Sequence, residues 1–257
     1  MNGIITLPLI PLRAGESDLS EMTSQLLFGE RVEIIESKDN WLFVKNSSDN
    51  YTGWVSRKML KLLSVKQEQS LTDITPYCVS RPLLLCQNSA NQNIYLPGGS
   101  LLPNYNNGKC FIGNEVFTVN SDEETFSEKI DGEKIASIAK QYLNAPYLWG
   151  GKSIFGIDSS GLVQVVFSIG GILLPRDAAK QVDSGTVIDF ISEAKAGDLA
   201  FFENAEGNII HVGILLNQNQ IIHSSGCVHI ETIDSQGIIS SETGKYTHKL
   251  RVIKRLV

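Results

Sequence analysis

The chain has 257 residues, 42% of them hydrophobic and 19% charged, an ordinary globular balance that excludes a disordered protein. Its net charge of −6 argues against nucleic acid or an anionic membrane as the main partner. The length suits one large domain or two to three small ones. No stretch approaches a membrane-spanning helix, and residues 1–12 lack the basic start of a signal peptide. We therefore expect a cytoplasmic protein, with an exported protein that has lost its signal peptide as the alternative.

The four cysteines, Cys78, Cys86, Cys110 and Cys227, show no paired metal-type spacing and no dense disulfide framework. We expect free, buried thiols, which favours a reducing compartment. The sequence gives no reason to expect a metal or another cofactor.

The N-terminal region predicts a small β-barrel. Short strand patterns lie at 32–35, 41–44 and 53–55, with turn residues at 39–40 and 47–50 between them. A sheet this small hides its edges by closing on itself. The GWV run at 53–55, followed by KML at 58–60, resembles the ending of a bacterial SH3 domain, so we place a first SH3-like domain at 1–62.

A second set of short strands predicts another SH3-like domain at 76–122. These strands lie at 77–79, 83–85, 93–96, 110–112 and 115–119, and PGG at 97–99 and NNG at 106–108 separate them. Residues 63–76 are polar and without a clear pattern, so they are interpreted as a linker. The acidic run 121–127 is interpreted as the second boundary.

The remaining residues, 127–257, predict an α+β domain. One apolar helical face includes residues 135, 138, 139 and 142, and Pro146 must end that helix. A second helix follows residue 161 and stops at the GG pair 170–171. Strand patterns then come in series at 198–202, 209–215, 220–223, 227–233 and 249–254. Helices before an antiparallel sheet indicate helices packed on one face of that sheet.

Three side chains in this domain are candidates for chemistry. Ser159 lies at a helix start, where free N–H groups and the helix dipole favour negative charge. Asp158 and Ser159 also suit the plain role of a helix N-cap. His211 and His223 lie on consecutive strands joined by the turn 217–219, and an antiparallel pair can bring their imidazoles side by side.

Short blocks around these residues form a recognisable set: 146–151 (PYLWGG), 156–158 (GID), 160–164 (SGLVQ), 174–178 (LPRDA), 197–199 (GDL), 211–214 (HVGI) and 222–224 (IHS). Together they resemble the nucleophile and histidine regions of the NlpC-type cell-wall cysteine peptidases, papain-like enzymes that cut peptidoglycan stem peptides. With two SH3-like domains in front, nearly the whole chain resembles the subgroup of γ-D-glutamyl-L-diamino acid endopeptidases. Those enzymes cut L-Ala-γ-D-Glu-diamino acid peptides that have a free N-terminus.

The resemblance implies a role for each matching catalytic residue. The group at 159 attacks the γ-glutamyl carbonyl, His211 moves the proton and His223 holds the His211 ring. The backbone N–H of residue 159 and the Tyr147 hydroxyl receive the oxyanion. We expect a monomer that binds peptidoglycan-derived peptides, with no nucleic acid or membrane partner.

The resemblance also implies a substrate pocket. Asp158 and Ser160 would contact the substrate, with Asp158 turned towards its ammonium group. In the family, an acidic side chain and a tyrosine of the first SH3 domain close this amine pocket. Glu21 and Tyr51 are the candidates here, and an ordinary surface role is the alternative for each. We therefore expect the site at the junction of the first and third domains.

The departure from the family lies at the nucleophile, where Ser159 stands in place of a cysteine. No other cysteine replaces it: three precede the third domain, and Cys227 follows both histidines. A thiol at a helix start beside a histidine ionises near neutral pH, whereas a hydroxyl needs a more strongly tuned base. Residue 157 is also not the first glycine of a Gly-x-Ser-x-Gly elbow.

Three other interpretations remain open. In the first, His223, Cys227 and His229 form a metal site, although no fourth ligand is obvious. In the second, the chain is a non-catalytic protein that binds wall peptides. The third interpretation, which we favour, is that Ser159 is an engineered replacement that preserves the shape of the site while removing the reactive thiol.

Overall fold

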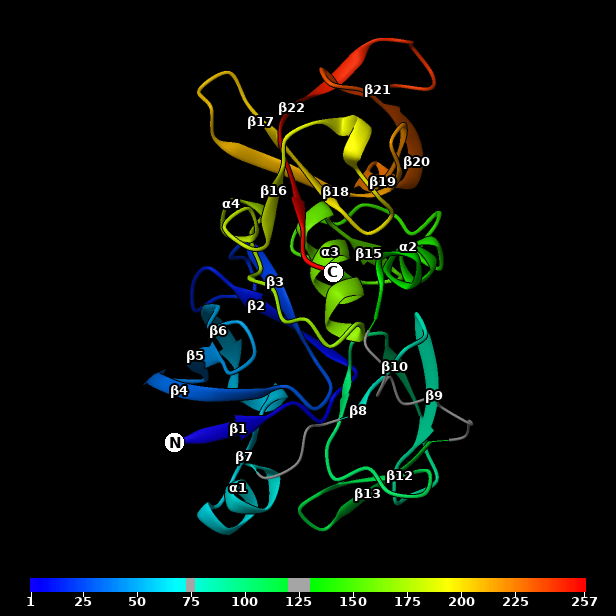
Figure 1. Ribbon diagram of the computed structural model, residues 1–257. Helices are drawn as coiled ribbons and strands as arrows, with labels where there is room; N and C mark the ends of the chain where they lie inside the picture. The colour runs from blue at the N-terminus through cyan, green and yellow to red at the C-terminus, as the bar shows by residue number, and fades with distance from the viewer. Residues whose placement is uncertain (73–76, 120–129) are drawn as a thin grey trace. The chain divides into compact units, whose positions relative to one another are not determined.

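The computed structural model describes residues 1–72, 77–119 and 130–257. The chain divides into two units, Met1–Thr125 and Phe126–Val257 (Figure 1). The predicted boundary at 121–127 and the end of the predicted linker, 73–76, lie outside the described residues. The three domain limits given above therefore stay predictions. Among the described residues, no helix combines the length and the hydrophobicity needed to span a membrane.

The first unit begins with a seven-stranded antiparallel sheet in the order β3-β2-β6-β5-β4-β1-β7. Its core consists of alternate residues of several strands, as expected for strands with one buried face; β5, for example, alternates strictly between partly exposed and buried positions. The strands predicted between 32 and 55 are confirmed. The sequence interpretation missed the first three strands and the short last strand at 61–62. The elements are β1 (Asn2–Ile4), β2 (Leu9–Arg13), β3 (Met22–Leu27), β4 (Arg31–Lys38), β5 (Trp41–Asn46), β6 (Thr52–Ser56), the 3-10 helix η1 (Arg57–Met59) and β7 (Lys61–Leu62).

The second part of this unit forms a four-stranded sheet, β10-β9-β13-β12, and a separate β8–β11 pair. All five predicted strands are present, and β11 was missed. The elements are β8 (Tyr77–Cys78), β9 (Leu83–Gln87), β10 (Asn93–Pro97), β11 (Leu101–Leu102), β12 (Lys109–Ile112) and β13 (Glu115–Val119). Ile4 of β1 and Phe28, just after β3, share one hydrophobic core with these strands. The two sheets therefore pack as one unit.

The stretch 63–76, interpreted as a linker without a clear pattern, contains the helix α1 (Val65–Thr72), so the expected lack of structure is wrong for those residues. The Ser64 hydroxyl accepts a hydrogen bond from the Gln67 amide at 3.3 Å, and the Gln67 side chain accepts from the Ser64 amide at 3.0 Å. This reciprocal pair is a capping box, which starts a helix even in a polar sequence. Leu63 and Leu71 at either end are buried.

The second unit contains a seven-stranded antiparallel sheet in the order β16-β22-β17-β18-β19-β20-β21, and β21 also pairs with β22. Six of these strands therefore close into a barrel, with β16 added outside it. The elements are α2 (Gly132–Lys140), β14 (Lys152–Ser153), β15 (Gly156–Ile157), α3 (Ser159–Ile169), α4 (Ala178–Gln181), β16 (Thr186–Ile188), η2 (Ile191–Glu193), β17 (Leu199–Glu203), β18 (Ile209–Asn217), β19 (Gln220–Ser225), β20 (Cys227–Ile233), β21 (Gly237–Ile239) and β22 (Tyr246–Arg255).

The helix α3 is central to this unit and is buried along nearly its whole length. It packs against α2 and α4 and lies on strands β18 and β19 (Figure 1). The predicted stop is confirmed: Gly170 caps the helix, and Gly171 has a φ of +75°, which favours glycine. The packing of α3 thus brings this helix against the two strands that carry the candidate histidines.

Candidate active site

Asp158 and Ser159 begin α3, as the sequence predicted. Asp158 is the N-cap: its Oδ1 accepts the Gly161 amide at 2.7 Å, while its Oδ2 accepts the Gly150 amide at 2.7 Å. Ser159 is the first helical residue and is only 8% exposed. A Cβ on Gly161 would lie 2.3 Å from the Gly151 carbonyl oxygen, so only glycine allows this approach of helix and loop.

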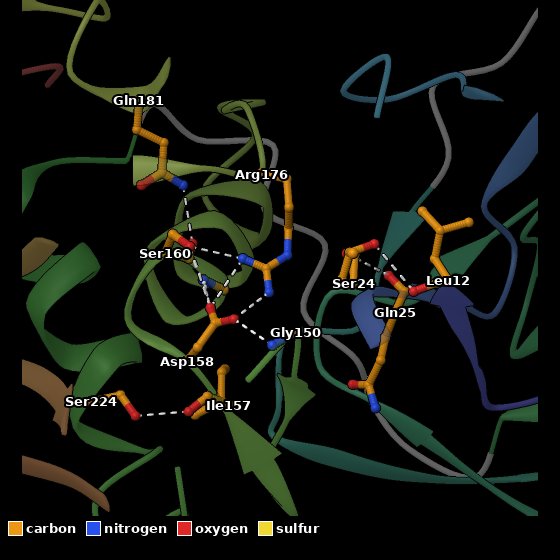
Figure 2. Close-up of polar contacts among 12 residues, drawn as sticks. Leu12, Ser24, Gln25, Gly150, Ile157, Asp158, Ser160, Arg176, Gln181 and Ser224 are labelled. Atoms are coloured by element: carbon orange, nitrogen blue, oxygen red, sulfur yellow. Dashed lines mark hydrogen bonds and ion pairs between the residues drawn. The ribbon is translucent and has the colours of Figure 1, made fainter. Parts of the chain in front are cut away.

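A buried arginine completes the cap. Arg176 donates from Nη1 to Asp158 Oδ1 at 3.0 Å and from Nη2 to Oδ2 at 2.5 Å, and both side chains are at most 8% exposed. Arg176 also donates to the Ser160 hydroxyl at 2.8 Å, and Gln181 donates to the Ser160 carbonyl at 3.0 Å (Figure 2). The sequence interpretation quoted the block containing Arg176 but missed this role. Asp158 is thus a structural ion-pair partner, and its predicted contact with a substrate ammonium stays a prediction.

The loop before α3 is tied to the strand that carries His223. The Ser224 hydroxyl donates to the Ile157 carbonyl at 2.7 Å (Figure 2), and the Tyr147 amide donates to the Gly226 carbonyl at 2.9 Å. Tyr147 keeps 40% of its surface exposed. Its partial burial and the nearby Asp158 carboxylate raise the pKa of its phenol, so the hydroxyl stays a proton donor at neutral pH.

The two predicted histidines are hydrogen-bonded to each other and to a glutamate. His211 Nε2 lies 2.9 Å from His223 Nδ1, and His223 Nε2 lies 3.1 Å from Glu231 Oε2. The other oxygen of Glu231, Oε1, accepts the Ser241 amide at 3.1 Å. The sequence interpretation treated His223 as the last member of the catalytic series and missed Glu231, which follows it.

The burial of these groups sets their charges. Burial, followed by the neighbouring His248 and His223, lowers the pKa of His211 well below its usual value. Burial also lowers the pKa of His223, against the opposing effect of Glu231. Burial acts to raise the pKa of Glu231, but the Ser241 amide and the hydrogen bond from His223 outweigh it and lower that pKa. At neutral pH both imidazoles are therefore neutral and the carboxylate is ionised.

These charges fix the tautomers. An ionised carboxylate only accepts, so His223 must carry its proton on Nε2 and donate it to Glu231. His223 Nδ1 is then an acceptor, and His211 must donate to it from Nε2. His211 consequently keeps Nδ1 unprotonated, which is the form that can act as a base.

All four histidines of the chain gather around this hydrogen-bonded series. His248, on β22, stacks on His211 with ring centroids 4.2 Å apart, and the His229 ring centroid lies 4.7 Å from that of His223. No sequence pattern singled out His248, because its strand is distant along the chain from those of His211 and His223. Stacking by His248 restricts the rotation of the His211 ring.

The remaining predicted residues lie in the first unit or are thiols. Glu21 is exposed just before β3, and Tyr51 packs against the core of the first sheet. Their contact with substrate stays a prediction. The cysteines are free thiols, as predicted; Cys86 and Cys110 are buried, whereas Cys78 and Cys227 are partly exposed.

The site combines a residue at a helix start with a pair of imidazoles on neighbouring antiparallel strands, and the helix packs on the sheet that these strands form. This arrangement defines the class of papain-like peptidases. The family models that match are the NlpC/P60 family over residues 144–249 and the bacterial dipeptidyl-peptidase SH3 domain over residues 12–60. The chain belongs to the NlpC/P60 family, as its predicted resemblance indicated.

Several curated relatives extend over both units. A γ-D-glutamyl-L-lysine dipeptidyl-peptidase of Bacillus subtilis is 31% identical over 78% of this chain and 71% of its own length. Dipeptidyl-peptidase 6 of Lysinibacillus sphaericus is 27% identical over 92% of this chain and 93% of its own length. The crystal structure of an NlpC/P60 protein from Bacillus cereus has a TM-score of 0.85 at 18% identity and covers 99% of both chains, which supports the fold.

Proposed function

We propose that this chain has the site of a γ-D-glutamyl-L-diamino acid endopeptidase that acts on L-Ala-γ-D-Glu-diamino acid peptides with a free N-terminus. We further propose that Ser159 leaves it able to bind these peptides but unable to cut them at an appreciable rate. The observation that carries this proposal is the His211–His223–Glu231 series on a sheet whose strands β18 and β19 pack against α3, with the Ser224–Ile157 hydrogen bond joining β19 to the residues just before that helix.

In this mechanism, the group at 159 attacks the γ-glutamyl carbonyl while His211 Nδ1 takes its proton. His211 becomes an imidazolium, which the neutral His223 and the ionised Glu231 stabilise through their hydrogen bonds. The oxyanion accepts hydrogen bonds from the residue 159 amide, at the positive end of α3, and from the Tyr147 hydroxyl. His211 then returns the proton to the leaving amine.

The site suits a thiol better than a hydroxyl. A helix N-terminus and an adjacent imidazole stabilise a thiolate near neutral pH, but they do not produce a comparable amount of alkoxide. The buried imidazole pair also holds the pKa of His211 low, which weakens it as a base for a serine. We favour an engineered exchange of cysteine for serine at 159, and the residue encoded by the native gene tests that statement directly.

Specificity for a free N-terminus is a further part of the proposal. An ammonium would be paired by acidic groups in a closed pocket, and Glu21, Tyr51 and Asp158 are the candidates for its walls. Arg176 already pairs with Asp158, so Asp158 by itself offers little net negative charge to an ammonium. Calorimetry with L-Ala-γ-D-Glu-diaminopimelate and its N-acetylated form tests this: equal affinities would exclude recognition of the free amine.

The matching experiment for catalysis is Ser159→Cys. This variant is expected to release the free diamino acid from L-Ala-γ-D-Glu-diaminopimelate, measured by chromatography, and to lose that activity with iodoacetamide or with added His211→Ala. If the variant binds peptide and is folded but stays inert, the peptidase proposal fails and a wall-peptide binding protein takes its place.

We also propose a monomer that acts in the cytoplasm on peptides released from the wall. Light scattering tests the monomer, and fractionation of the native host tests the location against the exported alternative.

A further inference from the structure

Two imidazoles and one carboxylate converge on the side of His223 that faces away from His211. One ligand atom from each of His223, His229 and Glu231 lies within 4.8 Å of the other two. The arrangement follows from the sheet register, because His229 on β20 is paired directly opposite His223 on β19. Glu231 is two residues further along β20 and therefore lies on the same face as His229.

The remaining polar atoms of these three residues already have partners. His229 Nδ1 lies 2.8 Å from the Cys227 carbonyl oxygen, Glu231 Oε1 accepts the Ser241 amide, and His223 Nδ1 contacts His211. A carbonyl only accepts, so His229 carries a proton on Nδ1, and its Nε2 faces Glu231 Oε2 at 3.5 Å. A metal ion that replaces any proton on Nε2 would lie between the electron pairs of these two atoms. Outer contacts of this kind orient the ligands of protein metal sites.

The two distances from Glu231 Oε2 to the histidine nitrogens suit zinc. Zn–N and Zn–O bonds of about 2.0–2.1 Å in a tetrahedron place neighbouring ligand atoms roughly 3.3 Å apart. Glu231 Oε2 lies 3.1 Å from His223 Nε2 and 3.5 Å from His229 Nε2. Imidazole nitrogen and carboxylate oxygen together are typical ligands of zinc and its neighbours in the transition series. The His229 side chain is 29% exposed, which gives an ion an entry route.

We propose that His223, His229 and Glu231 form an inhibitory Zn²⁺ site. Cys227, which the sequence suggested as a ligand, is not part of it, because its sulfur lies 3.9 Å from His229 Nδ1, whereas His229 faces Glu231 with Nε2. The metal is a regulatory ligand and takes no part in the reaction.

The effect on catalysis follows from the tautomers and rests on the proposed function. When His223 Nε2 binds a metal, its proton must move to Nδ1, which then donates to His211 Nε2. His211 in turn carries its proton on Nδ1. The nitrogen that would take the proton from residue 159 is then already protonated, and the site is switched off without any contact between the metal and the nucleophile.

Metal binding is tested first on the full chain with Ser159, purified without a polyhistidine tag. Titration calorimetry with Zn²⁺ is expected to give one site per chain, and Co²⁺ is expected to give a tetrahedral absorption spectrum without a thiolate charge-transfer band. His229→Gln should weaken binding by more than about 100-fold, since outer-shell changes alone reduce metal affinity 10–100-fold. Cys227→Ser is the matched control and should bind normally. Equal affinity of His229→Gln and the parent chain, or loss of binding in Cys227→Ser, would overturn the site; His229 would then be a charged partner of Glu231.

The switch itself has two further readouts. Nitrogen NMR of the imidazoles should show His211 Nδ1 becoming protonated when Zn²⁺ is added; an unchanged tautomer would refute the switch. In the Ser159→Cys background, Zn²⁺ should inhibit cleavage, and added His229→Gln should leave the metal-free rate unchanged and remove the inhibition. Inhibition that persists in the double variant would show that zinc acts on the thiolate instead. Because binding is measured on the Ser159 chain, an inert Ser159→Cys variant would count against the proposed function and not against the metal site.

Discussion

Replacing Glu231 by glutamine in the Ser159→Cys background is expected to slow cleavage without weakening substrate binding. Both carboxylate oxygens accept: Oε2 from His223 Nε2 at 3.1 Å and Oε1 from the Ser241 amide at 3.1 Å. A glutamine has one accepting oxygen, so its NH₂ group must face one of these two donors. If it faces His223, the imidazole tautomers reverse and His211 Nδ1 becomes protonated.

The magnitude follows from the loss of one hydrogen bond to a charged acceptor. Such bonds contribute about 1.5–3 kcal/mol. If the bond stabilises the imidazolium that forms on His211, this loss falls on the transition state, where about 1.4 kcal/mol corresponds to a tenfold change in rate. The expected fall in kcat is therefore about 10- to 150-fold. KM should change little, because Glu231 acts through His223 and has no proposed contact with the substrate.

The assay measures kcat and KM for release of the diamino acid from L-Ala-γ-D-Glu-diaminopimelate, with EDTA present to remove metal. Glu242→Gln is the matched control, because this exposed glutamate undergoes the same chemical change close by in the sequence. Thermal unfolding checks that both variants are folded. An unchanged kcat in folded Glu231→Gln, or a fall confined to KM, would refute the role of Glu231 in setting the tautomers.

Three more outcomes follow from packing and burial. Arg176→Met leaves the buried Asp158 carboxylate without its cation and should reduce the free energy of unfolding by about 3–5 kcal/mol, measured in urea; a loss below about 1 kcal/mol would contradict the importance of this ion pair. Gly213→Ala places a Cβ 3.0 Å from the His223 Cβ, so it should reduce stability by about 1–3 kcal/mol and also slow cleavage in the Ser159→Cys background. A stable and fully active variant would show that β18 and β19 can move apart. Burial raises the pKa of Cys110 to about 12, so this thiol stays protonated at neutral and mildly alkaline pH, and mass spectrometry should find it unmodified by iodoacetamide in the folded chain; rapid alkylation would contradict its burial.

The sequence determined those features that depend on neighbours along the chain. The apolar spacing of α3, its Asp158 cap and its glycine stop are local signals, and the helix forms where they predict it. The turn 217–219 likewise places His211 and His223 on consecutive strands. The capping box of Ser64 and Gln67 was an equally local signal, but the polar composition around it was interpreted as a linker.

Only the tertiary structure decided which distant residues join the two histidines. Glu231 and His229 lie on the same face of β20, and the register of β19 and β20 places that face beside His223. His248 lies near the two histidines because the sheet that contains β22 closes into a barrel. A glutamate within a strand is typical of a solvent-facing position, so its pattern alone does not reveal a buried acceptor. The pairing of Asp158 with Arg176 is undecided in the sequence for the same reason. Strand register and barrel closure are set by the whole core, whereas capping and periodicity are set within a few residues.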